Sequence, residues 1–275
     1  MKYSKGIFGV IGLALVVIQA CSCRGVVFED RSGCPRYVFI DVTNGDRVED
    51  DSEVGVLCRT VETKAPYVTY YTSVGKMESR EFYLTVEDEN YVDVFGIVNY
   101  QGCEYDGFSN WFVVNDTAFP ELYRFSGHCE LSAGTNVVPV ELCKEFSRVC
   151  VSLNGPWSDG SDVCPFELTV MGNSCGIDAK SGVPMYGGYR FRPEETGPGV
   201  FRFTVPRQLD DSLLLRLRLK GSVSYKGTYK DEIYMSTYLK VLGNVTWDEK
   251  NVPDIDFAVD CKDWTYSVTV YSFNI

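Results

Sequence analysis

The sequence predicts an all-β protein whose chain folds into antiparallel β-sandwiches. Aromatic residues make up 14% of the chain and are mostly Tyr and Phe, a bias that suits pleated, half-buried surfaces. Apolar residues alternate with polar ones along many short segments, and clusters rich in Gly, Asn, Asp and Pro separate these segments. Many short strands with such turns, and no long helical stretch between them, indicate sandwiches.

Residues 1–20 have the pattern of an export signal. Lys2 and Lys5 form a basic start, and an apolar run over residues 7–18 follows it. The run is shorter than the roughly 20 apolar residues that a membrane-spanning helix needs. We therefore expect this segment to be removed after export.

The first residue of the mature chain is predicted to be Cys21. Ile18 and Ala20 place an aliphatic and a small residue ahead of it, with Gln19 between them, which resembles the lipobox of bacterial lipoproteins. The resemblance implies that residues 1–20 are a lipoprotein signal peptide and that Cys21 carries the acyl chains. Each buried methylene contributes about 0.8 kcal/mol, so several chains would anchor the protein stably. Lipidation of Cys23, or ordinary secretion with both cysteines available for disulfides, remain the alternatives.

After a tether over residues 21–34, the chain alternates in four clear places. The apolar residues that share a face are Val38, Ile40 and Val42; Phe82, Leu84 and Val86; Val149, Val151 and Leu153; and Leu215, Leu217 and Leu219. In the last segment Arg216, Arg218 and Lys220 are expected to face water. These are strands with one solvated side.

Turn chemistry separates the strands. The predicted turns are "TNGD" at 43–46, "NYQG" at 99–102, "LNGPWSDGSD" at 153–162, "MGNSCG" at 171–176 and "ETGPGV" at 195–200. The segment "LSAGTNVVP" is the best candidate for a joint between domains. We therefore predict an N-terminal β-sandwich over residues 35–136 and a C-terminal β-sandwich over residues 137–275.

The chain contains 11 cysteines, ten of which follow Cys21. An exported chain can oxidise them, and Cys164 with Cys175, across one predicted hairpin, is the disulfide to test first. The spacing does not fix the connectivity, and buried reduced thiols are the alternative for each of them.

Several functions are disfavoured by composition. The net charge of −12 repels phosphate backbones, so we expect no nucleic-acid partner. The single histidine, His128, lies beside Cys129 without the spacing of a zinc site, and the acidic segment 41–53 does not fit an EF-hand, so no metal site is predicted. We expect no cofactor and no catalytic residues, because the chain has neither a Gly-x-Ser-x-Gly elbow nor a phosphate-binding glycine loop. The protein is therefore predicted not to be an enzyme.

Three stretches together resemble a known family. They are "EDRSGCPRYVFIDV" at 29–42, "VPVELCKEFSRVCVSL" at 138–153 and "VTWDEKNVPDIDFAVDCKDWTYSVTVYSF" at 245–273. In this order they are similar to the FimB-type fimbrial anchor subunits of Bacteroidales, the lipoproteins at the base of the major and minor fimbriae. The resemblance covers essentially the whole mature chain.

The resemblance implies two transthyretin-like sandwiches held at the outer membrane by the lipid on Cys21 and exposed at the cell surface. It also implies a non-enzymatic role in the fimbrium (pilus), in cell adhesion, in which the protein binds the neighbouring stalk subunit by β-strand addition. The segments at 116–118 and 211–213 are similar to a short O-glycosylation motif of that bacterial phylum, which would place sugars on Thr117 and Ser212.

A second hypothesis is a glycan-binding surface lipoprotein of a nutrient uptake system. Its motivation is four tryptophans, at positions 111, 157, 247 and 264, whose rings could stack on sugars. The alternative for these rings is that they fill the cores of the sandwiches. Exposed, coplanar tryptophans would distinguish the two.

Overall fold

The structure is a computed structural model of the chain. It describes residues 35–59, 68–87, 90–114, 116–157, 163–209, 213–220, 238–240, 251–262 and 265–271. The predicted signal peptide and tether, Cys21 and Ser212 lie outside these residues. In the part of the chain that is described, no helix is long and apolar enough to cross a membrane.

The first two sheets are built mainly from the N-terminal half of the chain. Sheet A has the order β4 (Leu84–Val86), β1 (Arg36–Val42), β9 (Thr135–Val140). Sheet B has the order β10 (Cys143–Lys144), β8 (Tyr123–Glu130), β5 (Tyr91–Val98), β2 (Glu53–Arg59), β3 (Val68–Ser73). Two short helices, η2 (Gly45–Arg47) and α2 (Val74–Glu78), join strands of these sheets.

The other two sheets take most of their strands from the C-terminal half. Sheet D has the order β14 (Glu195–Gly197), β15 (Val200–Pro206), β11 (Phe146–Asn154), β18 (Asp254–Asp260), β19 (Thr265–Tyr271). Sheet C has the order β17 (Tyr238–Lys240), β16 (Leu214–Leu219), β12 (Phe166–Asp178), β7 (Asn110–Phe112), β6 (Glu104–Tyr105), and β13 (Pro184–Phe191) also pairs with β12.

Sheets A and B pack face to face. A Cβ atom on Gly127 of β8 would lie 2.5 Å from the side chain of Val138 and 2.9 Å from that of Val140, both on β9. Those distances are shorter than carbon atoms tolerate, so the close approach of the two sheets requires glycine there. Val138 and Val140 are themselves buried.

The predicted alternation is confirmed where the structure describes it. Val38, Ile40 and Val42 are buried on β1, and the same holds for the named residues of β11 and for Leu84 and Val86. On β16, Leu215 and Leu217 are buried and Arg218 is exposed, whereas Arg216 and, just after the strand, Lys220 are half-buried and not fully in water as predicted. The all-β class is therefore correct, and burial of one side of each strand supplies the core.

Two strand pairs run parallel within these otherwise antiparallel sheets. β1 pairs with β9 in parallel, and β11 pairs with β18 in parallel. In each case many residues separate the two strands, so the chain has room for the crossover that a parallel pair needs. Alternation alone did not distinguish these pairs from antiparallel ones.

One predicted turn is wrong. The segment 171–176 continues through the long strand β12 instead of reversing the chain. Its pairing with β13 shifts register between Gly172 and Ser174 and again between Ser174 and Gly176. The glycines of this segment therefore serve β-bulges, a second common use of glycine in strands.

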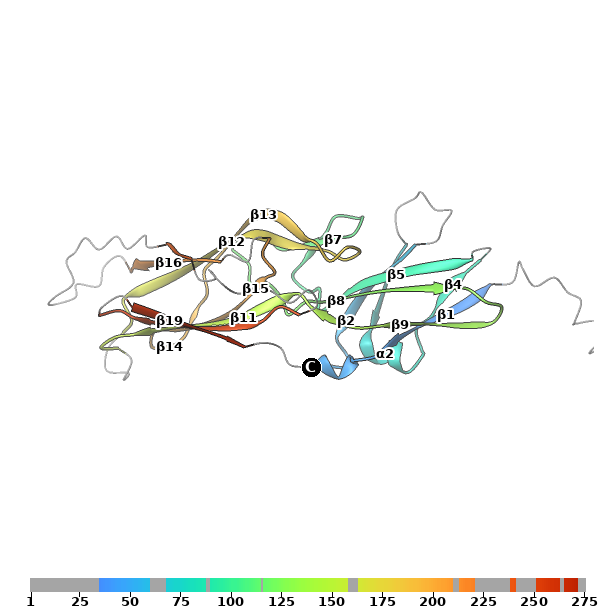
Figure 1. Cartoon of the computed structure of the whole chain (residues 1–275), viewed down its shortest axis with the longest axis horizontal. Helices are drawn as coiled ribbons and strands as arrows, with labels where there is room; N and C mark the ends of the chain where they lie inside the picture. Colours follow the sequence, from blue (N-terminus) through green and yellow to red (C-terminus); the bar gives the residue numbers. More distant parts are fainter. Residues whose placement is uncertain are drawn as a thin grey trace, which may run out of the picture.

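Figure 1 shows the arrangement of the four sheets along the long axis. Sheets A and B lie in one half of the molecule, and sheets C and D lie in the other. The strands β6 and β7 precede β8 in the chain but belong to sheet C, where β7 pairs with β12 and β6 pairs with β7. The boundary predicted between residues 136 and 137 falls inside β9. The division of the chain into two domains remains a prediction.

Candidate functional site

The open edge of β9 is the first candidate for an interaction site. Sheet A and sheet D share one arrangement: a central strand, β1 or β11, pairs in parallel with β9 or β18 on one side and antiparallel with β4 or β15 on the other. In sheet D a further antiparallel strand, β19, covers the outer edge of β18 over seven residue pairs. Among the described residues no strand occupies the corresponding position beside β9.

The composition of β9 fits an accessible edge. Residues 135–140, "TNVVPV", contain no charged side chain; charge is one of the features that protect an edge strand, and proline, which occurs once here, is another. Asn136, Val138 and Val140 point into the core, and Val137 on the outer side is 36% exposed. Pro139 lacks a backbone N–H, which is tolerated on an edge. The edge therefore offers backbone groups and an apolar row to an added strand.

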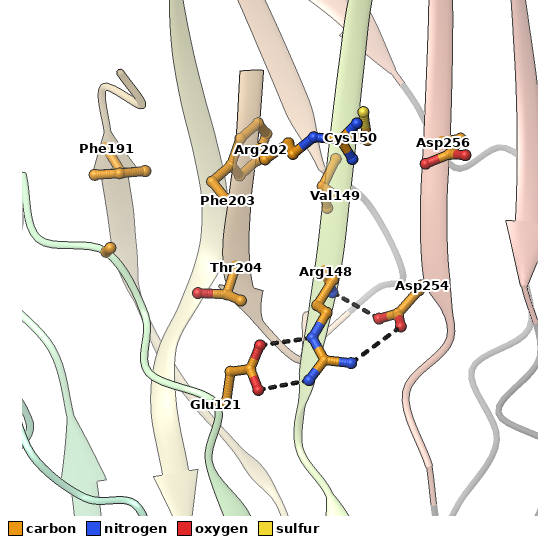
Figure 2. A pocket seen from close by; sticks show the side chains of 11 residues that line it. Glu121, Arg148, Val149, Cys150, Phe191, Arg202, Phe203, Thr204, Asp254 and Asp256 are labelled. Carbon is orange, nitrogen blue, oxygen red and sulfur yellow. Dashed lines mark hydrogen bonds and ion pairs between the residues drawn. The ribbon is translucent and has the colours of Figure 1, made fainter. Parts of the chain in front are cut away.

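A groove of about 480 Å³ on the outer side of sheet D is the second candidate site. Figure 2 shows Arg148 of β11 at its centre, between Glu121 and Asp254. Arg148 donates from Nε and Nη2 to the two carboxylate oxygens of Glu121, each at 2.6 Å. These hydrogen bonds raise the pKa of the Arg148 guanidinium, which stays charged.

Hydrogen bonds to sheet D hold one wall of the groove in place. Thr204 of β15 donates a hydrogen bond to the carbonyl of Phe119, so the segment carrying Glu121 is fixed to sheet D at two points. Arg202 and Asp256 are exposed on the same face. The groove therefore presents charged and hydrogen-bonding side chains, with the thiol of Cys150 among its lining residues.

A buried ionic network lies between the two halves of the molecule. The side chain of Glu145 has 0% exposure and accepts hydrogen bonds from Arg124 Nε at 3.0 Å and Arg207 Nη1 at 3.4 Å. Arg124 belongs to β8 of sheet B, whereas Arg207 directly follows β15 of sheet D. Burial raises the pKa of Glu145, and the two guanidinium groups oppose that rise.

Lys144 forms the second part of this network. Its Nζ lies 2.5 Å from Asp254 Oδ1 and donates to the carbonyl of Val252 at 2.9 Å, while its side chain is fully buried. Burial lowers the pKa of Lys144, and the carboxylate of Asp254 opposes that change. Sequence alone does not indicate the pair of Lys144 and Asp254, because the two residues lie 110 positions apart in the chain.

His128 and Thr117, the sequence-based candidates for metal binding and for glycosylation, lie in different parts of the structure. His128 on β8 forms an exposed pair with Asp93, with 2.7 Å between Nδ1 and Oδ1. Nowhere in the described ranges do three or more His, Cys, Asp or Glu side chains converge as metal ligands. Thr117 is exposed in the segment before β8, and its carbonyl accepts a hydrogen bond from Tyr189.

Two of the four tryptophans are buried. Trp157 has 0% exposure and donates from Nε1 to the carbonyl of Leu153. Trp111 of β7 has 2% exposure, stacks on Tyr105 at 4.7 Å between ring centroids, and covers Gly55 of β2. Both rings therefore fill the interior, as the alternative to glycan stacking expects, and Trp111 joins sheet C to sheet B. Positions 247 and 264 lie outside the described residues.

Cys164 and Cys175 are not brought together. Both residues are free thiols in the structure. Cys164 precedes β12 and Cys175 lies within it, so the two are separated by about 30 Å of extended strand. A disulfide needs Cα atoms within about 7 Å. The expected hairpin between these residues is replaced by one continuous strand.

No family model and no curated protein sequence matches this chain. Among solved structures, it is similar to a candidate polysaccharide-binding protein from Bacteroides thetaiotaomicron, with 11% identity and a TM-score of 0.55 over 86% of this chain and 95% of that one. A candidate adhesin from Bacteroides ovatus has 13% identity and a TM-score of 0.55, covering 88% of this chain and 93% of that one.

The fimbrial anchor protein Mfa2 of Porphyromonas gingivalis is also similar. Its identity is 12% and its TM-score 0.53, over 86% of this chain and 97% of that chain. At such identities the likeness shows a shared fold, and it extends over nearly the full length of all three neighbours. The chain thus has the architecture found in candidate adhesins and in a fimbrial anchor protein.

Proposed function

We propose that this protein is an outer-membrane lipoprotein that acts as a fimbrial anchor or assembly subunit. It would bind the neighbouring stalk subunit by β-strand addition at the edge of β9. The observation that carries the proposal is that no strand of the described part of the chain lies beside β9, whereas β19 occupies the equivalent position beside β18 in sheet D. The fold shared with a fimbrial anchor protein and the lipobox-like residues before Cys21 support the same role.

The strand β19 indicates what an incoming strand would look like. It runs antiparallel to β18 and pairs with it from Thr265 to Asp260 through Tyr271 to Asp254. Its sequence, "TYSVTVY", alternates and carries no charge. An incoming strand of this kind would gain main-chain hydrogen bonds from β9, and its alternate side chains would set the register.

Strand addition at β9 is tested by photo-crosslinking. A photoreactive phenylalanine analogue is placed at Thr135 of β9 and, as the matched control, at Thr269 of β19; both positions are exposed on edge strands. We expect the stalk subunit to be captured from position 135 and not from position 269. Capture from position 269 alone would show that the acceptor edge is in sheet D. Capture from neither position would contradict strand addition at both edges.

Anchoring is tested through Cys21. The tether 21–34 allows β1 to lie at most about 50 Å from the lipid, which suffices to hold the sheets clear of the headgroups. We expect Cys21→Ala to release the protein and its fimbriae from outer-membrane fractions, because the acyl chains are lost. Cys23→Ala is the matched control and should remain bound. Retention of Cys21→Ala in the membrane fraction would contradict the anchor role.

The alternative, a glycan-binding surface lipoprotein, is weakened because two of the four tryptophans proposed to bind sugars are buried. Its sugar platform was to be the tryptophans, and Trp111 and Trp157 are buried. A glycan array with the full chain decides between the two roles: reproducible, saturable glycan binding would favour this alternative.

A further inference from the structure

Two buried cysteines from different sheets lie at one end of the C and D pair. Cys164 lies two residues before the start of β12 of sheet C, and Cys261 directly follows β18 of sheet D. Both have 0% exposure and both belong to the hydrophobic core. Each therefore projects from its own sheet into the space that the two sheets share.

The surroundings of the two residues connect them. The backbone N–H of Cys261 donates to the carbonyl of Asn154, at the end of β11, at 3.0 Å. Three residues further on, Trp157 packs edge-on against Phe166, with 5.7 Å between ring centroids. Phe166 is the second residue after Cys164. One short segment, 154–157, thus contacts the immediate neighbourhood of both cysteines.

The electrostatics are consistent with this proximity. Burial raises the pKa of Cys261 to about 12, and the charge of a Cys164 thiolate contributes to the rise. Burial also raises the pKa of Cys164. A contribution of this kind agrees with the placement of Cys164 and Cys261 in the core at one end of the C and D pair.

We propose that Cys164 and Cys261 form a disulfide that joins sheet C to sheet D. The thiolate of one cysteine attacks the disulfide of an oxidising dithiol–disulfide exchange protein and displaces one of its sulfurs as a thiolate. The second cysteine, after losing its proton to solvent, attacks the mixed disulfide. One S–S bond forms within the chain, and the exchange protein leaves as the reduced dithiol.

The bond forms before the core closes. In the folded protein both thiols are buried and protonated, and only the thiolate is nucleophilic. Oxidation therefore takes place while the chain folds in an oxidising compartment. In this respect the inference rests on the proposed function, which requires export. Once formed, the bond is shielded from reductants by the same burial.

The test uses the full chain from residue 21, unfolded, reduced, and refolded with oxidised and reduced glutathione. We expect digestion without reductant to yield a cross-linked species that joins the peptides of Cys164 and Cys261. Reduction should lower the Tm by about 5 °C or more, because the bond closes a loop of about 100 residues. Cys261→Ala should abolish both effects. Cys175→Ala, in the strand β12 that follows Cys164, is the matched control and should retain both.

Two results overturn the proposal: alkylation of both thiols after oxidative refolding, or a cross-link from Cys164 to a different cysteine. Digestion of the wild-type protein identifies the cross-linked peptides, so the test does not depend on whether a variant folds. The same digest on protein isolated from cells separates the inference from the proposed function. A bond formed with glutathione but missing from the cellular protein would support the pairing and count against export.

Discussion

At the scale of single residues, the ion pair of Lys144 and Asp254 is the most consequential finding. The ammonium group is fully buried, whereas the Asp254 side chain is 26% exposed and also accepts a hydrogen bond from the backbone of Arg148. A buried charge is tolerated only while its partner stays in place, because water no longer solvates it. Loss of the Asp254 carboxylate alone should therefore destabilise this region more than loss of the Lys144 charge.

This dependence gives a prediction for substitutions at the pair. Asp254→Asn should lower the free energy of unfolding by about 3–5 kcal/mol, because it leaves the Lys144 ammonium buried without a counter-charge. Lys144→Met, which removes the charge and keeps the volume, should cost clearly less. Asp256→Asn, on the same strand but exposed, should change stability by about 0.5 kcal/mol or less. Urea unfolding measures all three, and an equal loss for Asp254→Asn and Asp256→Asn would contradict the argument.

For the strands, the sequence predicts which side chains share a face but does not predict which strands pair with each other. The faces of β1, β11 and β16 follow from alternation, since the side chains of a strand alternate whatever strand lies beside it. Pairing does not follow: nothing in residues 104–112 indicates that β6 and β7 join β12. The glycine-rich segment 171–176 has the composition of a turn, and only its neighbours β13 and β16 show that it is a bulged strand.

The candidate sites follow the same division. The sequence suggests Cys164 as a disulfide candidate, but Cys175 lies further along β12, and the partner that we propose for it, Cys261, is far along the chain. The edge of β9 could not be identified at all, because an edge is defined by the strand that is missing beside it. Burial of Lys144 and Glu145 was equally hidden, since two charged residues between Leu142 and Phe146 also fit a solvated loop.

At the scale of the whole molecule, the two halves are held together by contacts of different kinds. Glu145 bonds to Arg124 of sheet B and to Arg207 beside sheet D, and its backbone bonds to Leu122 and Arg207. Trp111 on sheet C packs over Gly55 of sheet B. Contacts of both kinds therefore tie the strands of one half to those of the other.

We therefore expect both halves to unfold in one cooperative transition, with equal calorimetric and van't Hoff enthalpies. Glu145→Gln leaves two largely buried guanidinium groups without their carboxylate, so it should cost about 3–5 kcal/mol and split the transition into two. Glu167→Gln is the control: it removes an exposed pair with Arg218, 3.9 Å apart, and should leave one transition at nearly the same Tm. Scanning calorimetry distinguishes these results. A single unshifted transition in Glu145→Gln would mean that the two halves are coupled through Trp111 and the shared strands alone.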